Sequence, residues 1–232
     1  MKILTTILIL ILSPFGTHSE ELTKADWIGF YLRDCSTVGY NYVCKQKLEK
    51  AISRMNHYLP MVTFQLRERN LPTYFALIPI IESHYSNLAV SIVNGEKFAL
   101  GKWQVSWRNI REYHKRQDLT LMSKKQIIRS RLWRHPEFNT RVATWVLSGY
   151  HKKYKNVRDT LYAYNAGSTK VNAWIRGEAK LPEETQNFYI QFLALEEIVR
   201  NQEKYSINAE DSTTYLRYVL KNKLQEASNW FN

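Results

Sequence analysis

Glu82 is the residue of this chain best placed to deliver a proton. It ends an apolar segment that is expected to form a helix over residues 72–81. Its helical stripe also contains Phe75, Ile78 and Pro79. Desolvation raises the pKa of a glutamic acid from about 4.3 toward 6 to 7, so that it stays protonated near neutral pH. The partial negative charge of a helix C-terminus acts in the same direction. Glu82 is thus a candidate general acid, with a solvent-facing glutamate at a helix end as the alternative.

Residues that could bind a sugar stand in further short strings. Ser83 follows Glu82 directly, and Gly101-Lys102-Trp103-Gln104 comes soon after. Ala163-Tyr164-Asn165-Ala166-Gly167 lies much further along the chain, followed by Leu181-Pro182-Glu183-Glu184-Thr185. Each string alone is weak evidence for a sugar-binding site. The pentapeptide, for example, is also explained by a helix that merely ends at Gly167. The order of the strings, however, is hard to obtain by chance.

In this order the strings resemble the active-site motifs of lytic transglycosylases, which cut the glycan strands of bacterial peptidoglycan. The resemblance extends over residues 72–200 and fits best the branch called membrane-bound lytic murein transglycosylase D. It implies a mainly α, lysozyme-like fold. Lys102 departs from the apolar residue usual at its position. Residues 94–98 also make the segment that precedes this motif longer than in the common pattern of the family.

The resemblance implies a lyase reaction with a single catalytic glutamic acid. Glu82 would protonate the leaving oxygen of the β-1,4 bond between N-acetylmuramic acid and N-acetylglucosamine, supported by Ser83. The N-acetyl carbonyl would assist at the anomeric carbon. Glu82 would then deprotonate the 6-hydroxyl to give a 1,6-anhydro ring, without cofactor or metal. Ordinary glycosidases use two carboxylates, and we expect no second acid beside these strings, because Glu96 is the only one between Glu82 and Gln104.

The same resemblance implies the residues that bind the substrate. Gln104 would hydrogen-bond the sugar or its N-acetyl group, and Trp103 would pack beneath the site. Asn165 would bind the acetamido group, and Tyr164 would approach the catalytic centre or orient that group. Glu184 would organise the wall of the site from a helix start, together with the threonine that follows it, without being catalytic.

Two other functions stay open at this point. A hydrolytic muramidase of the same fold would release reducing ends instead of anhydro ends. A non-catalytic cell-wall-binding protein of a secretion or conjugation machine could keep the same site, although intact Glu82, Gln104 and Asn165 argue against it. His84 also has two interpretations. It could line the site and make activity depend on pH near neutrality, or it could be a loop histidine in solvent.

The charge of the chain indicates its class of partner. Lys and Arg number 33 against 21 Asp and Glu, which gives a net charge of +12. Such an excess attracts polyanions, which include the carboxylate-rich peptides and acidic polymers of a cell wall. The basic residues are scattered over expected helices and form no recognised nucleic-acid module. We therefore expect the protein to bind peptidoglycan glycan strands and no nucleic acid. We also expect a monomer. Association with envelope secretion or conjugation machinery is left open.

The first nineteen residues have the layout of a secretory signal peptide. A lysine at position 2 precedes an apolar run over residues 3–12, and the small residues Thr17 and Ser19 follow. The run is shorter than the roughly 20 apolar residues that span a bilayer, although an N-terminal membrane anchor is the alternative. No cysteine follows it, so we expect no lipoprotein. The sequence predicts an exported protein of the periplasm or the extracellular space.

The two cysteines fit such a compartment. Cys35 and Cys44 are a close pair outside the motif region, and in an oxidising space they most simply form a disulfide. Two free thiols are the alternative. The histidines are scattered without the spacing of metal ligands, so we expect no zinc site.

Helical patterns predominate along the chain. Leu48, Ile52, Met55 and Leu59 repeat at helical spacing, and we expect Pro60 to interrupt this helix. Other helices are expected to begin at the capping box of Ser123, at Pro136 and at Pro182, and to stop at Gly167 and Gly177. A small β-hairpin could form near residues 89–105, where Ser-Ile-Val and Trp-Gln-Val pieces flank Asn94-Gly95.

Together these patterns predict a mainly α protein with helical extensions at both ends. A signal peptide would cover residues 1–19 and an N-terminal helical extension residues 20–70. The lysozyme-like transglycosylase catalytic domain would cover residues 71–205. A C-terminal helix packed on the domain would cover residues 206–232, marked by the apolar positions Leu216, Leu220, Leu224, Ala227 and Phe231.

Overall fold

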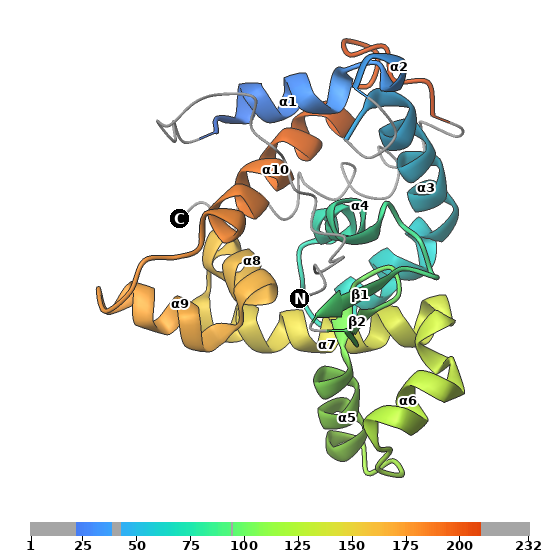
Figure 1. The fold of residues 1–232 in the computed structure, drawn as a ribbon, viewed down its shortest axis with the longest axis vertical. Helices are drawn as coiled ribbons and strands as arrows, with labels where there is room; N and C mark the ends of the chain where they lie inside the picture. The colour runs from blue at the N-terminus through green and yellow to red at the C-terminus, as the bar shows by residue number, and fades with distance from the viewer. Residues whose placement is uncertain (1–21, 39–42, 94, 210–232) are drawn as a thin grey trace.

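The fold is built mainly from helices. The computed structural model describes residues 22–38, 43–93 and 95–209 (Figure 1). The α-helices are α1 (Lys24–Leu32), α2 (Cys35–Val38), α3 (Lys45–Arg67), α4 (Ile78–Ser83), α5 (Trp107–Arg116), α6 (Lys124–Ser130), α7 (Pro136–Tyr154), α8 (Val157–Ala166), α9 (Ser168–Ile175) and α10 (Glu183–Arg200). The 3-10 helices are η1 (Thr73–Leu77) and η2 (Leu132–Arg134), and the strands are β1 (Val90–Val93), β2 (Glu96–Leu100) and β3 (Val105–Ser106).

The short helix α4 occupies the middle of this arrangement. It packs against α3 on one side and α10 on the other (Figure 1). The long helix α7 crosses the molecule, with α8 and α9 near one of its ends and α5 and α6 near the other (Figure 1). One hydrophobic cluster extends from Trp27 in α1 to Ala209, and so includes residues on both sides of the motif region. The division into a catalytic domain and extensions stays a prediction.

Helix α3 corrects the expectation for Pro60. The helix continues through this proline and ends only at Arg67. Its buried face continues as well, because Val62 and Leu66 beyond the proline are as fully buried as Leu59 before it. Proline costs about 3 kcal/mol inside a helix, but burying two large aliphatic side chains contributes about as much or more. The packing of the helix therefore outweighs the local preference of Pro60, which lies on the exposed face.

The three strands form a small antiparallel sheet in the order β1-β2-β3. The β1–β2 hairpin pairs Val93 with Glu96 and Val90 with Leu100, with a register shift between Ser91 and Ile92. The mainly α prediction and the predicted hairpin within residues 89–105 are thus confirmed. The second strand lies earlier than the Trp-Gln-Val piece, in which Trp103 and Gln104 belong to the turn between β2 and β3, and Val105 begins β3.

Most helix boundaries follow the expected local signals. Ser123 forms a capping box with Gln126 before α6, and Pro136 is the first residue of α7. Gly167 ends α8, and Pro182 directly precedes α10. The single helix expected over residues 72–81 is instead η1 followed by α4. Pro79 lies in the first turn of α4, where its missing N–H costs nothing, so the proline favours a new helix start there.

Cys35 and Cys44 are joined in a disulfide, as expected. The signal peptide and the apolar positions from Leu216 onward lie outside the described residues, and residues 206–209 at the start of the expected last helix are not helical. Within the described ranges, no helix is long and apolar enough to cross a membrane.

Replacing Pro60 by alanine should stabilise the protein. Pro60→Ala restores a helical hydrogen-bond donor on the exposed face of α3, and we expect the free energy of unfolding to rise by about 1–3 kcal/mol. Urea unfolding measures this change. Pro136→Ala is the matched control, because proline is favourable at a helix start and its loss should give no gain. An equal gain in both variants, or a loss in Pro60→Ala, would contradict the account of α3.

Candidate active site

Glu82 is held in the last turn of α4 by the packing of that helix between α3 and α10. Its side chain is partly buried, and burial raises the pKa of the carboxyl to about 8. The negative charge of Glu184 raises this pKa further. Glu82 is therefore largely protonated at neutral pH, as a general acid must be before it reacts.

The influence of Glu184 corrects the expectation that no second acid would stand near the motifs. About a hundred residues separate the two glutamates along the chain, but α4 and α10 are in contact. Glu184 lies in the first turn of α10, where the helix dipole favours its negative charge, and its side chain is exposed. The pair thus consists of a partly buried Glu82, which resists ionisation, and an exposed Glu184, which raises the pKa of Glu82.

Ser83 connects the end of α4 to the turn between β2 and β3. Its hydroxyl donates a hydrogen bond of 2.7 Å to the backbone carbonyl of Lys102 and accepts one of 3.1 Å from the backbone N–H of Ser86. The serine therefore attaches the backbone that follows Glu82 to this turn. Direct support of the carboxyl group by this hydroxyl stays a prediction.

The turn over residues 101–104 needs glycine at its first position. Gly101 has a φ of 74°, in the left-handed region that favours glycine. A Cβ at this position would lie 2.7 Å from both the side-chain nitrogen of Asn139 and the carbonyl oxygen of Trp133. Neither neighbour can easily move, because both belong to packed helical segments. Any side chain at Gly101 would displace the turn that carries Gln104.

Asn139 holds both sides of this turn, although it belongs to no motif recognised in the sequence. The side chain is buried and donates from Nδ2 to the Leu100 carbonyl at 3.0 Å. Its Oδ1 accepts a bond of 3.0 Å from the backbone N–H of Trp103. The only signal in the sequence is a polar residue on the stripe of α7 that also carries Val142 and Val146.

The side chain of Trp103 is fully buried, and its packing beneath a bound sugar stays a prediction. Its indole N–H donates to the hydroxyl of Thr140 at 3.0 Å. The Tyr164 hydroxyl donates to the Trp103 carbonyl at 2.7 Å, which links α8 to the turn. Burial, with a further contribution from the charge of Glu82, raises the pKa of Tyr164 well above its usual value. The Tyr164 hydroxyl is thus committed to the backbone, and the role of this tyrosine at a catalytic centre stays a prediction.

The polar groups of Gln104 are both engaged within the protein. Its Nε2 donates to the Gly101 carbonyl at 2.7 Å, and its Oε1 accepts from the Ser91 hydroxyl at 2.5 Å. Ser91 lies in β1, and the sequence gives no signal that this strand would support the glutamine. A hydrogen bond from Gln104 to the sugar stays a prediction.

Asn165 is oriented from the first turn of α10. Its Oδ1 accepts a hydrogen bond of 2.8 Å from the hydroxyl of Thr185, which is buried. This bond fixes the orientation of the amide, so that the Nδ2 group serves as a donor from a partly exposed side chain. The strings around Asn165 and Glu184 are therefore brought together.

Lys102 has an environment that is unusual for a lysine. The side chain is fully buried, with its Nζ 3.2 Å from the ring centroid of Tyr58 and 5.4 Å from that of Tyr85. No described residue provides a hydrogen-bond acceptor for this Nζ. Burial lowers the pKa of Lys102 to about 7, while the faces of the two tyrosines attract the ammonium form. The lysine therefore occupies the place of an apolar side chain by packing against aromatic rings.

His84 fits neither of its two interpretations. It ends α4 with a φ of 51°, and its side chain is partly buried, not in solvent. Burial, with smaller contributions from the charges of Lys47 and Arg54, lowers the pKa of the imidazole to about 4. The group is therefore neutral across the physiological range and does not titrate near pH 7. No group of three or more potential metal-ligating side chains occurs among the described residues.

Similarity to known proteins agrees with this arrangement. A family model described as the transglycosylase SLT domain matches residues 63–187, which is more than half of the chain. This chain therefore belongs to the transglycosylase SLT domain family. The matched region contains Glu82, Gln104, Asn165 and Glu184, and the residues that support them from α7.

Individual relatives are more distant. Two curated proteins, each named membrane-bound lytic murein transglycosylase D and found in two strains of Escherichia coli, are 25% identical over 198 residues. The alignment covers 79% of this chain but 41% of each relative, so the chain spans about two fifths of their length. A solved structure of an inactive mutant of the lytic transglycosylase Slt from Pseudomonas aeruginosa is 22% identical, with a TM-score of 0.43 over 72% of this chain and 24% of that one.

Removal of the buried amine of Lys102 should stabilise the protein most at low pH. Below pH 7 the folded state keeps a buried ammonium. Between pH 7 and 10.5 it loses the proton before the unfolded chain does, so this cost shrinks as the pH rises. We expect Lys102→Met to raise the free energy of unfolding by roughly 2 kcal/mol at pH 6, after allowance for the attraction of the tyrosines.

Urea unfolding at pH 6 and at pH 9.5 measures the effect of Lys102→Met. Lys97→Met, at an exposed position of β2, is the control and should show no such dependence on pH. A gain for Lys102→Met that is equal at both pH values, or a loss at pH 6, would show that the amine carries no burial cost.

Proposed function

We propose that this chain is a peptidoglycan lytic transglycosylase that cleaves the β-1,4 bond between N-acetylmuramic acid and N-acetylglucosamine. The observation that carries the proposal is the raised pKa of Glu82, about 8, at the point where the three family motifs converge. Such an acid holds its proton at neutral pH and can deliver it to the leaving oxygen. The membership in the SLT domain family supports the same activity.

The high pKa of Glu82 suits both halves of the proposed reaction. After the carboxyl has protonated the leaving oxygen, a buried carboxylate remains beside the charge of Glu184. This arrangement makes the carboxylate a stronger base than one in water. It can therefore take the proton of the 6-hydroxyl, which closes the 1,6-anhydro ring on the anomeric carbon. The proton is returned to Glu82, and no water is consumed.

Asn165 is proposed to hold the acetamido group that assists at the anomeric carbon. Its Nδ2 is a donor of suitable chemistry for the acetamido carbonyl, and the Thr185 hydroxyl keeps the amide in that orientation. Gln104, in the adjoining turn, is proposed to contact the sugar from the other side of the motif cluster. These two amides would select N-acetylated sugars over plain glucose units.

A hydrolytic muramidase is the second candidate, because Glu184 provides a second carboxylate that interacts with Glu82. Glycosidases that use water place two carboxyl groups across the scissile bond. Two observations argue against this role. Glu184 is exposed at a helix start, and its effect on Glu82 is to raise the pKa of that carboxyl. No described residue is seen to hold the Glu184 carboxylate in place over a sugar. The two candidates differ in their products.

We also infer that the protein acts outside the cytoplasm. The disulfide between Cys35 and Cys44 is typical of an oxidising compartment, and peptidoglycan is found there. Export by the predicted signal peptide would bring the chain to this substrate.

The product of digestion tests the proposed reaction. Digested peptidoglycan should yield muropeptides that end in 1,6-anhydro-N-acetylmuramic acid, lighter by one water than reducing-end products, in mass spectrometry. Glu82→Gln should lower the rate by a factor of about a thousand or more, because the amide cannot donate the proton. Reducing ends as the main product would support the muramidase. Unchanged clearance by Glu82→Gln would sink the assignment of the acid.

The pH profile tests the influence of Glu184. Activity should fall as the pH rises past about 8, where Glu82 loses its proton. Glu184→Gln removes a negative charge and should move this alkaline limb to lower pH by roughly 0.5 to 1 unit. Glu183→Gln makes the same charge change one residue away and should leave the limb in place. If both variants move the limb equally, or neither does, the specific interaction is absent.

A further inference from the structure

Positive charge is concentrated in one short part of the chain. The 28 residues from Trp107 to Arg134 contain nine lysines and arginines and two acids, which gives them a net charge of +7. The whole chain of 232 residues has a net charge of +12. This segment, which contains α5, α6 and η2, therefore carries more than half of the excess. Charge gathered in this way indicates an anionic partner for this part of the protein.

Helices α5 and α6 form one end of the molecule. They pack against each other, and Figure 1 shows the loop that joins them at the opposite end from α1 and α2. We call this loop, residues 117–123, the leucine loop, because it contains Leu119 and Leu121. Two basic residues directly precede the loop and two directly follow it, so positive charge lies at both of its ends. They are Lys115, Arg116, Lys124 and Lys125.

The preferences of a helix do not explain all of this charge. The dipole of α5 favours the cations of its last turn, but Lys124 and Lys125 occupy the first turn of α6, where the dipole disfavours positive charge. Lys124 is compensated by an ion pair with Glu96 of β2. Lys115 and Lys125 are exposed, and neither forms an ion pair with a described residue. Their charges are therefore open to an anionic partner.

The leucine loop combines this charge with apolar surface. Leu119 is 47% exposed and Leu121 is 53% exposed. The loop is held at both ends, because the Leu119 backbone N–H donates a bond of 2.9 Å to the His114 carbonyl and Met122 packs against the core. Single exposed leucines are common on protein surfaces. Two of them between two pairs of basic residues fit the surface of an anionic bilayer, where apolar side chains enter the interface and cations meet the headgroups.

A cavity extends the basic surface from the leucine loop along α6. Its volume is about 440 Å³, and it lies between β2 and α6. The described residues that line it are Glu96, Lys97, Lys124, Lys125, Ile128 and Arg129. Four of these are cations, and the single carboxylate is already paired with Lys124. The lining is therefore complementary to the phosphate of a lipid headgroup.

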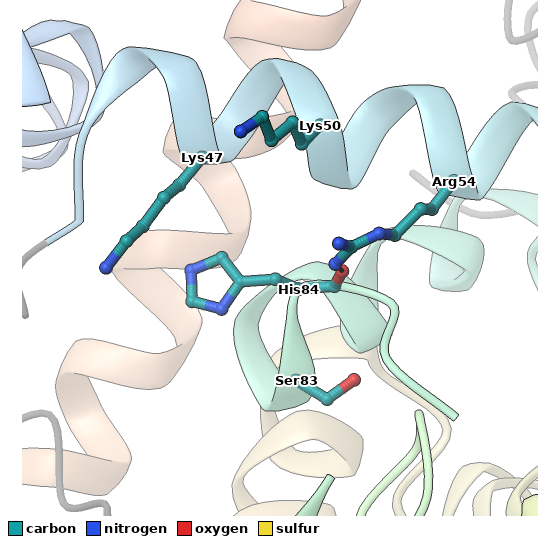
Figure 2. A pocket seen from close by; sticks show the side chains of 5 residues that line it. All are labelled: Lys47, Lys50, Arg54, Ser83 and His84. Atoms are coloured by element: carbon teal, nitrogen blue, oxygen red, sulfur yellow. Dashed lines mark hydrogen bonds between the residues drawn. The ribbon is translucent and has the colours of Figure 1, made fainter. Parts of the chain in front are cut away.

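The cations near the end of α4 make a different kind of surface. Lys47, Lys50 and Arg54 of α3 line a cavity there together with Ser83 and His84 (Figure 2). The Arg54 guanidinium donates a bond of 3.2 Å to the His84 carbonyl, so this cation joins α3 to the end of α4. No apolar side chain lines this cavity among the described residues. It therefore lacks the apolar companions that the cations of the α5–α6 end have.

We propose that the leucine loop and the basic helix ends beside it dock on the surface of an anionic lipid bilayer. Leu119 and Leu121 would enter the interface, while Lys115 and Lys125 would meet lipid phosphates. The cavity beside α6 would receive one headgroup. This inference goes beyond the proposed function, because the contact involves neither Glu82 nor the glycan strand. It would hold the protein at a membrane by its α5–α6 end.

Cosedimentation with lipid vesicles tests this docking. The protein is used in its exported form without residues 1–19, because their apolar run could bind vesicles by itself. The vesicles contain either equal parts of phosphatidylglycerol and phosphatidylcholine or phosphatidylcholine alone. We expect binding to the anionic vesicles to be at least about tenfold tighter than to the neutral ones, because each lysine near an anionic surface adds to the attraction.

The charge variant is Lys115→Gln/Lys125→Gln. We expect it to bind the anionic vesicles at least about tenfold more weakly than the unmodified protein, because it removes two cations at the lipid surface. Its control is Lys152→Gln/Lys153→Gln, the same change of charge at exposed positions of α7. This control should lose less than about twofold, because salt screens charges that are distant from the lipid.

The leucine variant is Leu119→Ser/Leu121→Ser, which keeps every charge. We expect it to bind the anionic vesicles at least about fivefold more weakly, because it removes the side chains that enter the interface. Its control is Phe64→Ser/Ile175→Ser, which removes two exposed apolar side chains elsewhere and should bind like the unmodified protein. Thermal melts check that each variant is folded.

The proposal is overturned if the unmodified protein does not bind the anionic vesicles, or if a variant and its control lose equally. A loss in the charge variant alone also overturns it, because a soluble polyanion needs the cations but not the leucines. A loss in the leucine variant alone overturns the role of the anionic lipid. None of these measurements depends on catalysis, so a failure of the proposed function is detected separately, in the digestion of peptidoglycan.

Discussion

The burial of one carboxyl group is the constraint on which the site depends. Glu82 has a pKa of about 8 because α4 is packed between α3 and α10, and because Glu184 adds a like charge. A shift of this size corresponds to several kcal/mol that disfavour the charged form. The surrounding structure must supply that energy through its own packing. A well-filled core, with side chains from α1 to the segment after α10, provides it.

The contacts around the turn at residues 101–104 show how that packing is kept in place. Asn139 holds the backbone on both sides of Gly101, and the Tyr164 hydroxyl holds the carbonyl of Trp103. Ser83 then attaches the end of α4 to the same turn. Three segments that are distant in sequence are thus linked through backbone groups of one turn. A shift in any of them would change the solvent exposure of Glu82 and hence its pKa.

Local signals predicted much of the fold, but only where local energy decided the outcome. The caps at Ser123 and Gly167 followed their expected preferences, since little else competes at those positions. Pro60 shows the opposite case, because burial of the residues beyond it outweighs the local cost. The exchange of a predicted helix for η1 and α4 is instead a local effect, because Pro79 favours a new helix start.

The catalytic motifs were found because their residues are adjacent in the chain, whereas their supports are scattered. Asn139 and Ser91 act from other elements, and nothing in their neighbours marks them. Lys102 was noted as a departure, but its burial depends on Tyr58 and Tyr85, which meet it only in the folded protein. The effect of Glu184 on Glu82 also required the contact between α4 and α10. These features depend on contacts between segments that are distant in the sequence, so sequence patterns could not predict them.

Direct titration of the Glu82 carboxyl tests the central claim. Carbon-13 NMR of protein labelled at the glutamate side chains can follow each carboxyl against pH, and the signal missing from Glu82→Gln assigns this one. The account predicts a midpoint near pH 8, well above the value of about 4.5 for a glutamate in water. A midpoint near 4.5 would mean that Glu82 is ionised at neutral pH and cannot serve as the acid of this site.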